Sequence, residues 1–215
     1  MAHEAFATKH DSVGTGYLRR ASRFRSSQGQ VLVEYVFVLP LLLLILLGVI
    51  EMSYLLHDQH IVTRLTREGS NLISRNVTLF DAGTAMISMV NPPVDLNSSN
   101  SKLIFSVLTN YNSSGSNYNH VIVYQRYEIG SFTAASAFTT QGSLSSASFG
   151  PQPNYIAVNP SNDTNLQVTN VPASLTLNLG QYVYVTEIYT RHNLITPFNN
   201  FGISLPSTLY SVAYF

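Results

Sequence analysis

Glu34 is the residue whose type and position point most directly to chemistry in this chain. It is the fourth residue of the apolar run Val31–Ile50 and is followed by Tyr35. A carboxylate at the centre of a membrane-spanning helix costs roughly +2.5 to +3.5 kcal/mol, and less near an end. The acid therefore predicts a partner charge. Cleavage of the chain after Gly29 would supply one, because Glu34 would then lie beside a new amino terminus.

Histidine provides the one pattern that could suggest a metal site. His57 and His60 flank Asp58 within four residues, but a single nearby carboxylate favours polar residues at a membrane edge. His120 and His192 are isolated in the sequence, which favours packing or solvation. The chain has no cysteine, which excludes thiol catalysis, Cys-ligated zinc and iron–sulfur clusters. We therefore predict no metal and no cofactor.

Catalytic patterns are equally sparse. Glu128 and Glu187 lie on different predicted strands and could meet as a catalytic pair. Because only 10% of residues are charged, pairing with Arg126 or Arg191 is the simpler interpretation. The sequence has no Gly-x-Ser-x-Gly turn and no glycine-rich phosphate loop. We therefore expect that the protein is not an enzyme.

The distribution of charge predicts a membrane topology. Residues 1–29 carry five Lys/Arg and two Asp/Glu, whereas the chain from Gln30 carries six Lys/Arg and nine Asp/Glu. A net charge of zero gives no reason to expect nucleic acid as a partner. Cations just before an apolar run stay on the cytoplasmic side. The amino terminus should therefore be cytoplasmic, and the chain after Ile50 should be exported.

The element that must position Glu34 is a long helix. Twenty residues from Val31 to Ile50 are enough to span the hydrocarbon layer, which is roughly 30 Å thick. No small-x-small cleavage site follows them, so the span should be retained. The helix should run from about Gln30 to about Arg75, with a bend or loosened turn at Pro40. Beyond the span, an apolar stripe is predicted at Met52, Leu55, Val62, Leu65, Gly69 and Leu72.

The chain from residue 76 to 215 predicts an exported β-rich domain. A short helix is expected at 81–90, with Asp81 as its N-cap. Residues 131–165 are rich in Ser, Thr and Asn and are interpreted as a surface excursion. Runs of β-branched and aromatic residues predict strands at 102–109, 120–129, 166–168, 181–190 and 209–215. The fold class is therefore α+β: a long N-terminal transmembrane helix, then a mainly antiparallel sheet.

The opening of the chain resembles a known family. Gly29 with Glu34-Tyr35, and the apolar run closing in Gly-Val-Ile-Glu51, is similar to a prepilin processing site. The resemblance is to the TadE-like pseudopilins of the tight-adherence (Flp, type IVc) pilus system. It continues through Thr66–Ser70 and returns weakly in the aromatic strand at 180–187.

This resemblance implies a role for each residue of the opening. A membrane prepilin peptidase would remove the basic leader 1–29 by cutting between Gly29 and Gln30. Glu34 and Tyr35 would serve assembly and axial register, with Glu34 neutralising the amino group of a neighbouring subunit. The implied partners are this peptidase, the major Flp pilin, a second pseudopilin, the inner-membrane assembly platform and membrane lipid. The implied function is biogenesis of an adhesive pilus.

Two other classes of function stay open at this point. One is a signal-anchored envelope protein whose β domain binds a glycan or a surface ligand. The other is an enzyme, which would require a pocket with convergent polar groups. Mass spectrometry of the native protein separates the first alternative from a pseudopilin, because only a pseudopilin would begin at Gln30.

Overall fold

The structure is a computed structural model that describes residues 24–196, 202, 204 and 206–215. Most of the predicted leader, residues 1–23, lies outside the described residues. The chain divides into two compact units, Met1–Val49 and Ile50–Phe215. Each unit is described by itself below.

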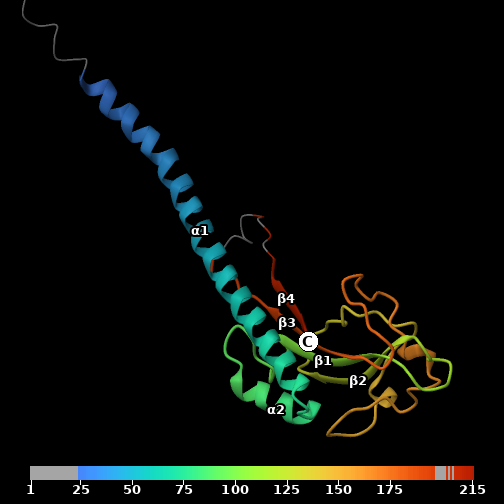
Figure 1. Cartoon of the computed structure of the whole chain (residues 1–215). Helices are drawn as coiled ribbons and strands as arrows, with labels where there is room; N and C mark the ends of the chain where they lie inside the picture. Colours follow the sequence, from blue (N-terminus) through green and yellow to red (C-terminus); the bar gives the residue numbers. More distant parts are fainter. Residues whose placement is uncertain (1–23, 197–201, 203, 205) are drawn as a thin grey trace, which may run out of the picture. The chain divides into compact units, whose positions relative to one another are not determined.

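Helix α1 spans Phe24–Ser74 and contains Pro40 (Figure 1). The predicted long helix is thus confirmed, but it begins six residues earlier than Gln30. No glycine or proline precedes Gly29 in this stretch, and extending an existing helix by a residue costs far less than nucleating one. These residues therefore extend the helix of the apolar run.

In the first unit, α1 is apolar on every side from Val31 to Val49, apart from Glu34. From Gly29 to Val49 each residue is exposed except Gly48, which is half-buried. Glu34 is the one charged residue in this stretch. A helix that is apolar all round requires an apolar environment. By length and composition α1 can cross a membrane, which suggests an N-terminal membrane anchor.

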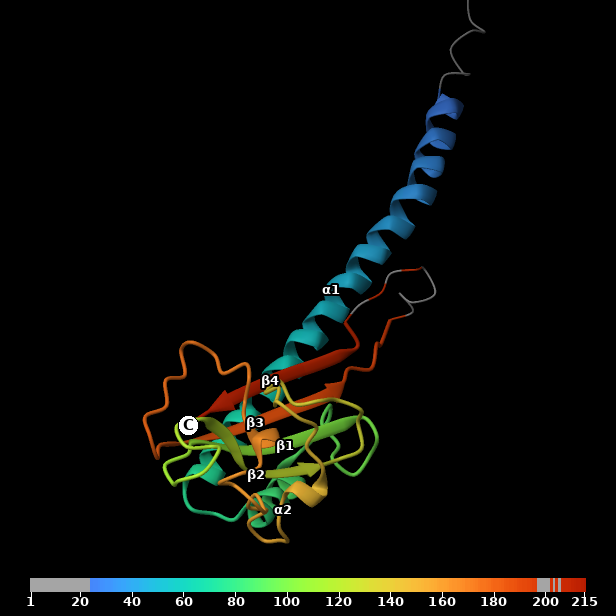
Figure 2. The same cartoon turned by 90° about the vertical axis from the view of Figure 1, so that its right-hand side faces the viewer.

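The second unit is built on a four-stranded antiparallel sheet with strand order β2-β1-β3-β4 (Figure 2). The strands are β1 Ser101–Asn110, β2 Val121–Ile129, β3 Tyr182–Arg191 and β4 Thr208–Tyr214. Four of the five predicted strands are therefore confirmed, with ends that shift by one residue. The fifth prediction, 166–168, is wrong. This segment holds the end of a 3₁₀ helix, Thr164–Leu166, followed by isolated bridges at Gln167 and Val168.

Two helices cover one face of the sheet. The second half of α1 and helix α2, Leu79–Met89, share a buried cluster with Leu103, Phe105 and Ile188 of the strands (Figure 1). The cap of α2 differs from the prediction. Thr78 is the N-cap, and its hydroxyl accepts from Asp81 N at 3.1 Å and donates to the Asp81 carboxylate at 2.7 Å. Asp81 thus lies in the first turn, where its charge favours the helix dipole.

The stripe predicted on α1 is partly wrong. Val62, Leu65 and Gly69 are buried against the sheet, but Met52 is 48% exposed and Glu51 is fully buried instead. The prediction ranked residues by hydrophobicity. The turn of α1 at Glu51, however, faces the loop after β3, which is rich in hydrogen-bond donors.

The other face of the sheet is covered by the segment between β2 and β3. Phe138, Phe149 and Leu166 are buried there against Leu108 and Val185 of the strands. The predicted surface excursion at 131–165 is therefore a covering layer for the sheet. Its few apolar residues are spaced widely among Ser and Asn, and for that reason the composition did not predict a core.

Candidate functional site

The predicted processing and assembly residues all lie on α1. Gly29 and Gln30 stand within the helix, and Glu34 and Tyr35 follow one turn later. All four residues are exposed. Gln30 and Glu34 are four residues apart, which puts them on one helix face, roughly 6 Å apart along the axis. A carboxylate at position 34 is therefore suited to meet an amino group held at the level of residue 30.

Glu34 has no counter-charge within its own chain, as far as side chains are described. Among residues from Gly29 onward, no cation is within ion-pair distance of its carboxylate. Gly29 is equally open, because a Cβ added to it would meet nothing within 4 Å. The geometry leaves both residues available to a partner molecule.

The motif Thr66–Ser70 joins α1 to the sheet. Gly69 lets the helix approach closely, since a Cβ there would lie 2.8 Å from Thr186 Cγ2 and 3.2 Å from Phe105 Cε1. The Ser70 hydroxyl donates to the carbonyl of Ala213 in β4 at 2.9 Å. Glu68 faces outward and pairs with Arg64 at 2.9 Å. This motif is therefore explained by packing.

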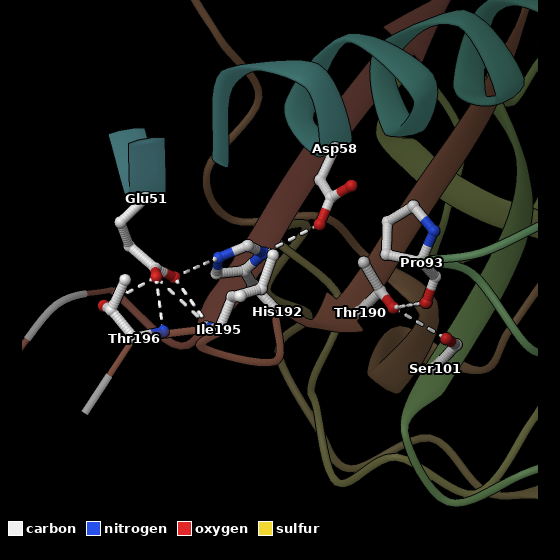
Figure 3. A network of polar contacts seen from close by, with 8 residues as sticks. All are labelled: Glu51, Asp58, Pro93, Ser101, Thr190, His192, Ile195 and Thr196. Carbon is white, nitrogen blue, oxygen red and sulfur yellow. Dashed lines mark hydrogen bonds and ion pairs between the residues drawn. The ribbon is translucent and has the colours of Figure 1, made fainter. Parts of the chain in front are cut away.

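A polar network at the start of the second unit was not predicted from the sequence. The Glu51 carboxylate is fully buried and accepts hydrogen bonds from four donors (Figure 3). The donors are Thr196 N at 2.8 Å, Thr196 Oγ1 at 2.7 Å, Ile195 N at 3.2 Å and His192 Nε2 at 3.2 Å. A buried carboxylate is tolerated when its oxygens are satisfied in this way. Glu51 therefore fastens the chain after β3 onto α1.

His192 extends this network to a second carboxylate. It is 3% exposed, and its Nδ1 lies 2.7 Å from Asp58 Oδ2. His192 thus lies between two carboxylates, with one at each ring nitrogen. His192 was predicted to serve packing or solvation because it is isolated in the sequence, but the fold places it between two carboxylates. A usable signal existed, because Glu51 and Asp58 are seven residues apart and hence share one helix face.

The two glutamates considered as a catalytic pair serve other contacts. Glu128 pairs with Lys102 at 2.8 Å. Glu187 is fully buried and accepts from Ser136 Oγ at 2.5 Å and from Ala137 N at 2.7 Å. The predicted partner Arg126 reaches Glu187 only through Ser136. Nη2 of Arg126 donates at 3.2 Å to the Ser136 hydroxyl, and this hydroxyl donates to Glu187. The predicted direct pairing with arginine is therefore wrong for both glutamates.

Two tyrosines complete the surroundings of Glu187. The hydroxyls of Tyr210 and Tyr189 lie 3.3 and 3.4 Å from Oε1. Burial, and then the charge of Glu187, raises the pKa of Tyr189 to about 12 and raises that of Tyr210 further. Both tyrosines therefore stay neutral, and their hydroxyls donate to the buried Glu187 side chain. In the described part of the chain, no three His, Cys, Asp or Glu side chains are grouped to hold a metal.

Comparison with known proteins points to the N-terminal helix. The family model described as "TadE-like protein" matches residues 29–71, which lie wholly within α1. The match begins at the predicted processing residue Gly29 and ends just after the Thr66–Ser70 motif. No curated protein and no solved structure matched the chain. The chain therefore carries a segment at residues 29–71 that is similar to the TadE-like family.

Proposed function

We propose that this protein is a TadE-like minor pilin, or pseudopilin, required for biogenesis of a Flp-type adhesive pilus. The observation that carries the proposal is the coincidence of the family match with the physical character of α1. The match starts at Gly29, and from there Glu34 is the one charge on an exposed apolar helix through Val49.

Processing after Gly29 follows from this proposal. A prepilin peptidase would cut between Gly29 and Gln30 on the cytoplasmic side of the inner membrane, and the leader 1–29 would be removed. The new amino group at Gln30 would lie one helical turn from Glu34. Pairing between adjacent subunits would spare both charges from burial alone in hydrocarbon.

The same proposal assigns partners and a location. The mature chain would be a single-pass inner-membrane protein with residues 51–215 in the periplasm, before or during incorporation into a pilus. Its partners would be the prepilin peptidase, the major Flp pilin, a second pseudopilin, the inner-membrane assembly platform and lipid. The sheet domain is far larger than the apolar helix, which supports a minor rather than a major subunit.

Intact-mass measurement of the native protein tests the proposal. We expect a chain that begins at Gln30 in cells with prepilin peptidase and a chain with its leader in cells without it. Gly29→Val should block processing. This loss of processing is attributable to the peptidase, because a side chain at Gly29 meets nothing within 4 Å in its own chain. Val33→Leu, a conservative change in the same exposed stretch, is the matched control. A native protein that retains residues 1–29 would exclude the proposal.

A further inference from the structure

A cleft lies along the edge strand β2, between this strand and part of the segment that follows it. Its volume is about 450 Å³, and Arg126, Glu128, Ser145, Ser146, Phe149 and Tyr155 are among the residues that line it. Small-molecule sites usually fall in this size range and combine apolar walls with a few polar groups. We propose that this cleft binds a neutral saccharide unit.

The walls of the cleft provide an aromatic surface. Tyr155 stacks on Tyr127 with ring centroids 4.3 Å apart and an interplanar angle of 6°. Phe149, which also lines the cleft, is 9% exposed. The negative face of an aromatic ring attracts the slightly positive C–H groups of a pyranose ring. The aromatic residues therefore suit the apolar face of a sugar better than a fully polar ion.

Tyr155 is held in an unfavourable backbone conformation. Its φ of 50° is in the left-handed region, which costs energy for a residue with a Cβ. Two backbone hydrogen bonds of 3.3 Å fix it, from Arg126 N to Tyr155 O and from Tyr155 N to Pro151 O. Strain of this kind is concentrated at functional sites. Here it places a large ring at the cleft where a glycine would have been free of strain.

The polar groups of the cleft match the hydroxyls of a sugar. Arg126 and Glu128 are two residues apart on β2 and therefore project from the same face of the strand. The guanidinium is a planar set of donors and the carboxylate is a pair of acceptors. Arg126 is oriented by Ser106 and Ser136, each at 3.2 Å. Glu128 pairs with Lys102 through Oε2 at 2.8 Å, and its side chain is 41% exposed.

The charges around the cleft favour a neutral ligand. Two cations, Arg126 and Lys102, stand among two carboxylates, Glu128 and Glu187. Burial lowers the pKa of the Arg126 guanidinium, and the carboxylates of Glu128 and Glu187 oppose that shift. The local charge is therefore already balanced. An acidic sugar would add an anion without a free counter-charge, whereas uncharged hydroxyls require none.

The test is a titration of the full chain with neutral sugars. The probes are methyl glucoside, methyl galactoside, methyl mannoside and N-acetylglucosamine, followed by saturation-transfer NMR. The detergent must carry no sugar headgroup, because maltosides and glucosides would compete. Ser146→Trp fills the cleft from its exposed rim. Ala147→Trp is the matched control, because Ala147 is the next residue and is also exposed but is not among the residues that line the cleft.

We expect saturable binding of at least one probe and its weakening by about tenfold or more in Ser146→Trp. Ala147→Trp should bind like the wild type, and both variants should unfold at the wild-type temperature. The proposal is overturned if no probe binds saturably, if Ser146→Trp binds normally, or if glucuronate binds more tightly than every neutral probe. Ser146→Trp should leave leader removal and pilus assembly intact, so this test is independent of the pilin proposal.

Discussion

Glu34 and Glu51 lie at opposite ends of the apolar run, and their environments differ completely. Glu51 is fully buried and is satisfied by backbone and side-chain donors of its own chain. Glu34 is exposed on an apolar helix and has no cation near it among the described side chains. The free-energy cost of burying the Glu51 carboxylate is thus offset within the fold. The cost of placing the Glu34 carboxylate in hydrocarbon must instead be offset by another molecule.

The substitution Glu34→Gln tests that requirement. The glutamine keeps the size of the side chain and removes its charge, so membrane insertion should be retained or improved. Incorporation into pili should be lost, because no anion remains for the amino group of a neighbouring subunit. The measurements are the amount of protein in the membrane fraction and in sheared pili. Glu34→Asp is the charge-preserving control, and normal piliation in Glu34→Gln would refute the role assigned to this residue.

The substitution His192→Ala tests the network in which His192 joins Glu51 to Asp58. The change removes the hydrogen-bond partner that Glu51 and Asp58 share, and a buried polar group left without its partner costs about 1–3 kcal/mol. At roughly 2–4 °C per kcal/mol for a unit of this size, the unfolding temperature should fall by about 2–12 °C. Circular dichroism of the full chain in detergent measures this. His120→Ala is the control, because His120 is exposed, and an equal effect of both variants would contradict the network.

At the scale of elements, the contact between α1 and the sheet depends on a missing side chain. Gly69 lies where β1 and β3 present Phe105 and Thr186. Glycine lowers helix stability by about 1 kcal/mol relative to alanine, so its presence inside α1 needs a reason in packing. A Cβ on residue 69 would lie only 2.8 Å from Thr186 Cγ2, and this close approach supplies that reason.

A double-mutant cycle of Gly69→Ala and Thr186→Ser measures this close approach. Thr186 is β-branched and stiff, so the new methyl group must push the helix or the strand, at a cost of about 1–3 kcal/mol. Thr186→Ser removes Cγ2, and Gly69→Ala should then be less destabilising by at least about 1 kcal/mol. Chemical denaturation gives the four free energies of unfolding. Additive effects would mean that the two groups do not meet.

At the scale of the whole molecule, the sequence predicted elements better than it predicted contacts. β1 and β3 were predictable because β-branched and aromatic residues are dense there, as in Val183 and Val185. The stretch 166–168 contains apolar residues but forms a 3₁₀ turn and bridges, because three residues are too few to outweigh their surroundings. The pairing of Glu51 with His192 joins residues 141 positions apart, which no local pattern encodes.

The segment that matches the TadE-like family model was predictable for the opposite reason. The pattern of Gly29 and Glu34 is defined by their spacing along one helix, and that spacing is visible in the sequence alone. The cleft at β2 was not, because its walls come from three separate stretches of the chain around Arg126, Ser145 and Tyr155. Local information thus specifies α1, whereas tertiary packing specifies the second unit.

The division into two units predicts that residues 50–215 fold without the apolar helix. Every residue of both buried clusters lies between Leu55 and Val212, and the buried network of Glu51 is also retained in this fragment. The fragment should therefore be soluble without detergent, because the long exposed apolar run is removed. It should unfold cooperatively at a temperature close to that of the same unit in the full chain. Size-exclusion chromatography and thermal denaturation check both expectations, and a fragment that aggregates or unfolds without cooperativity would show that the core requires the residues before Ile50.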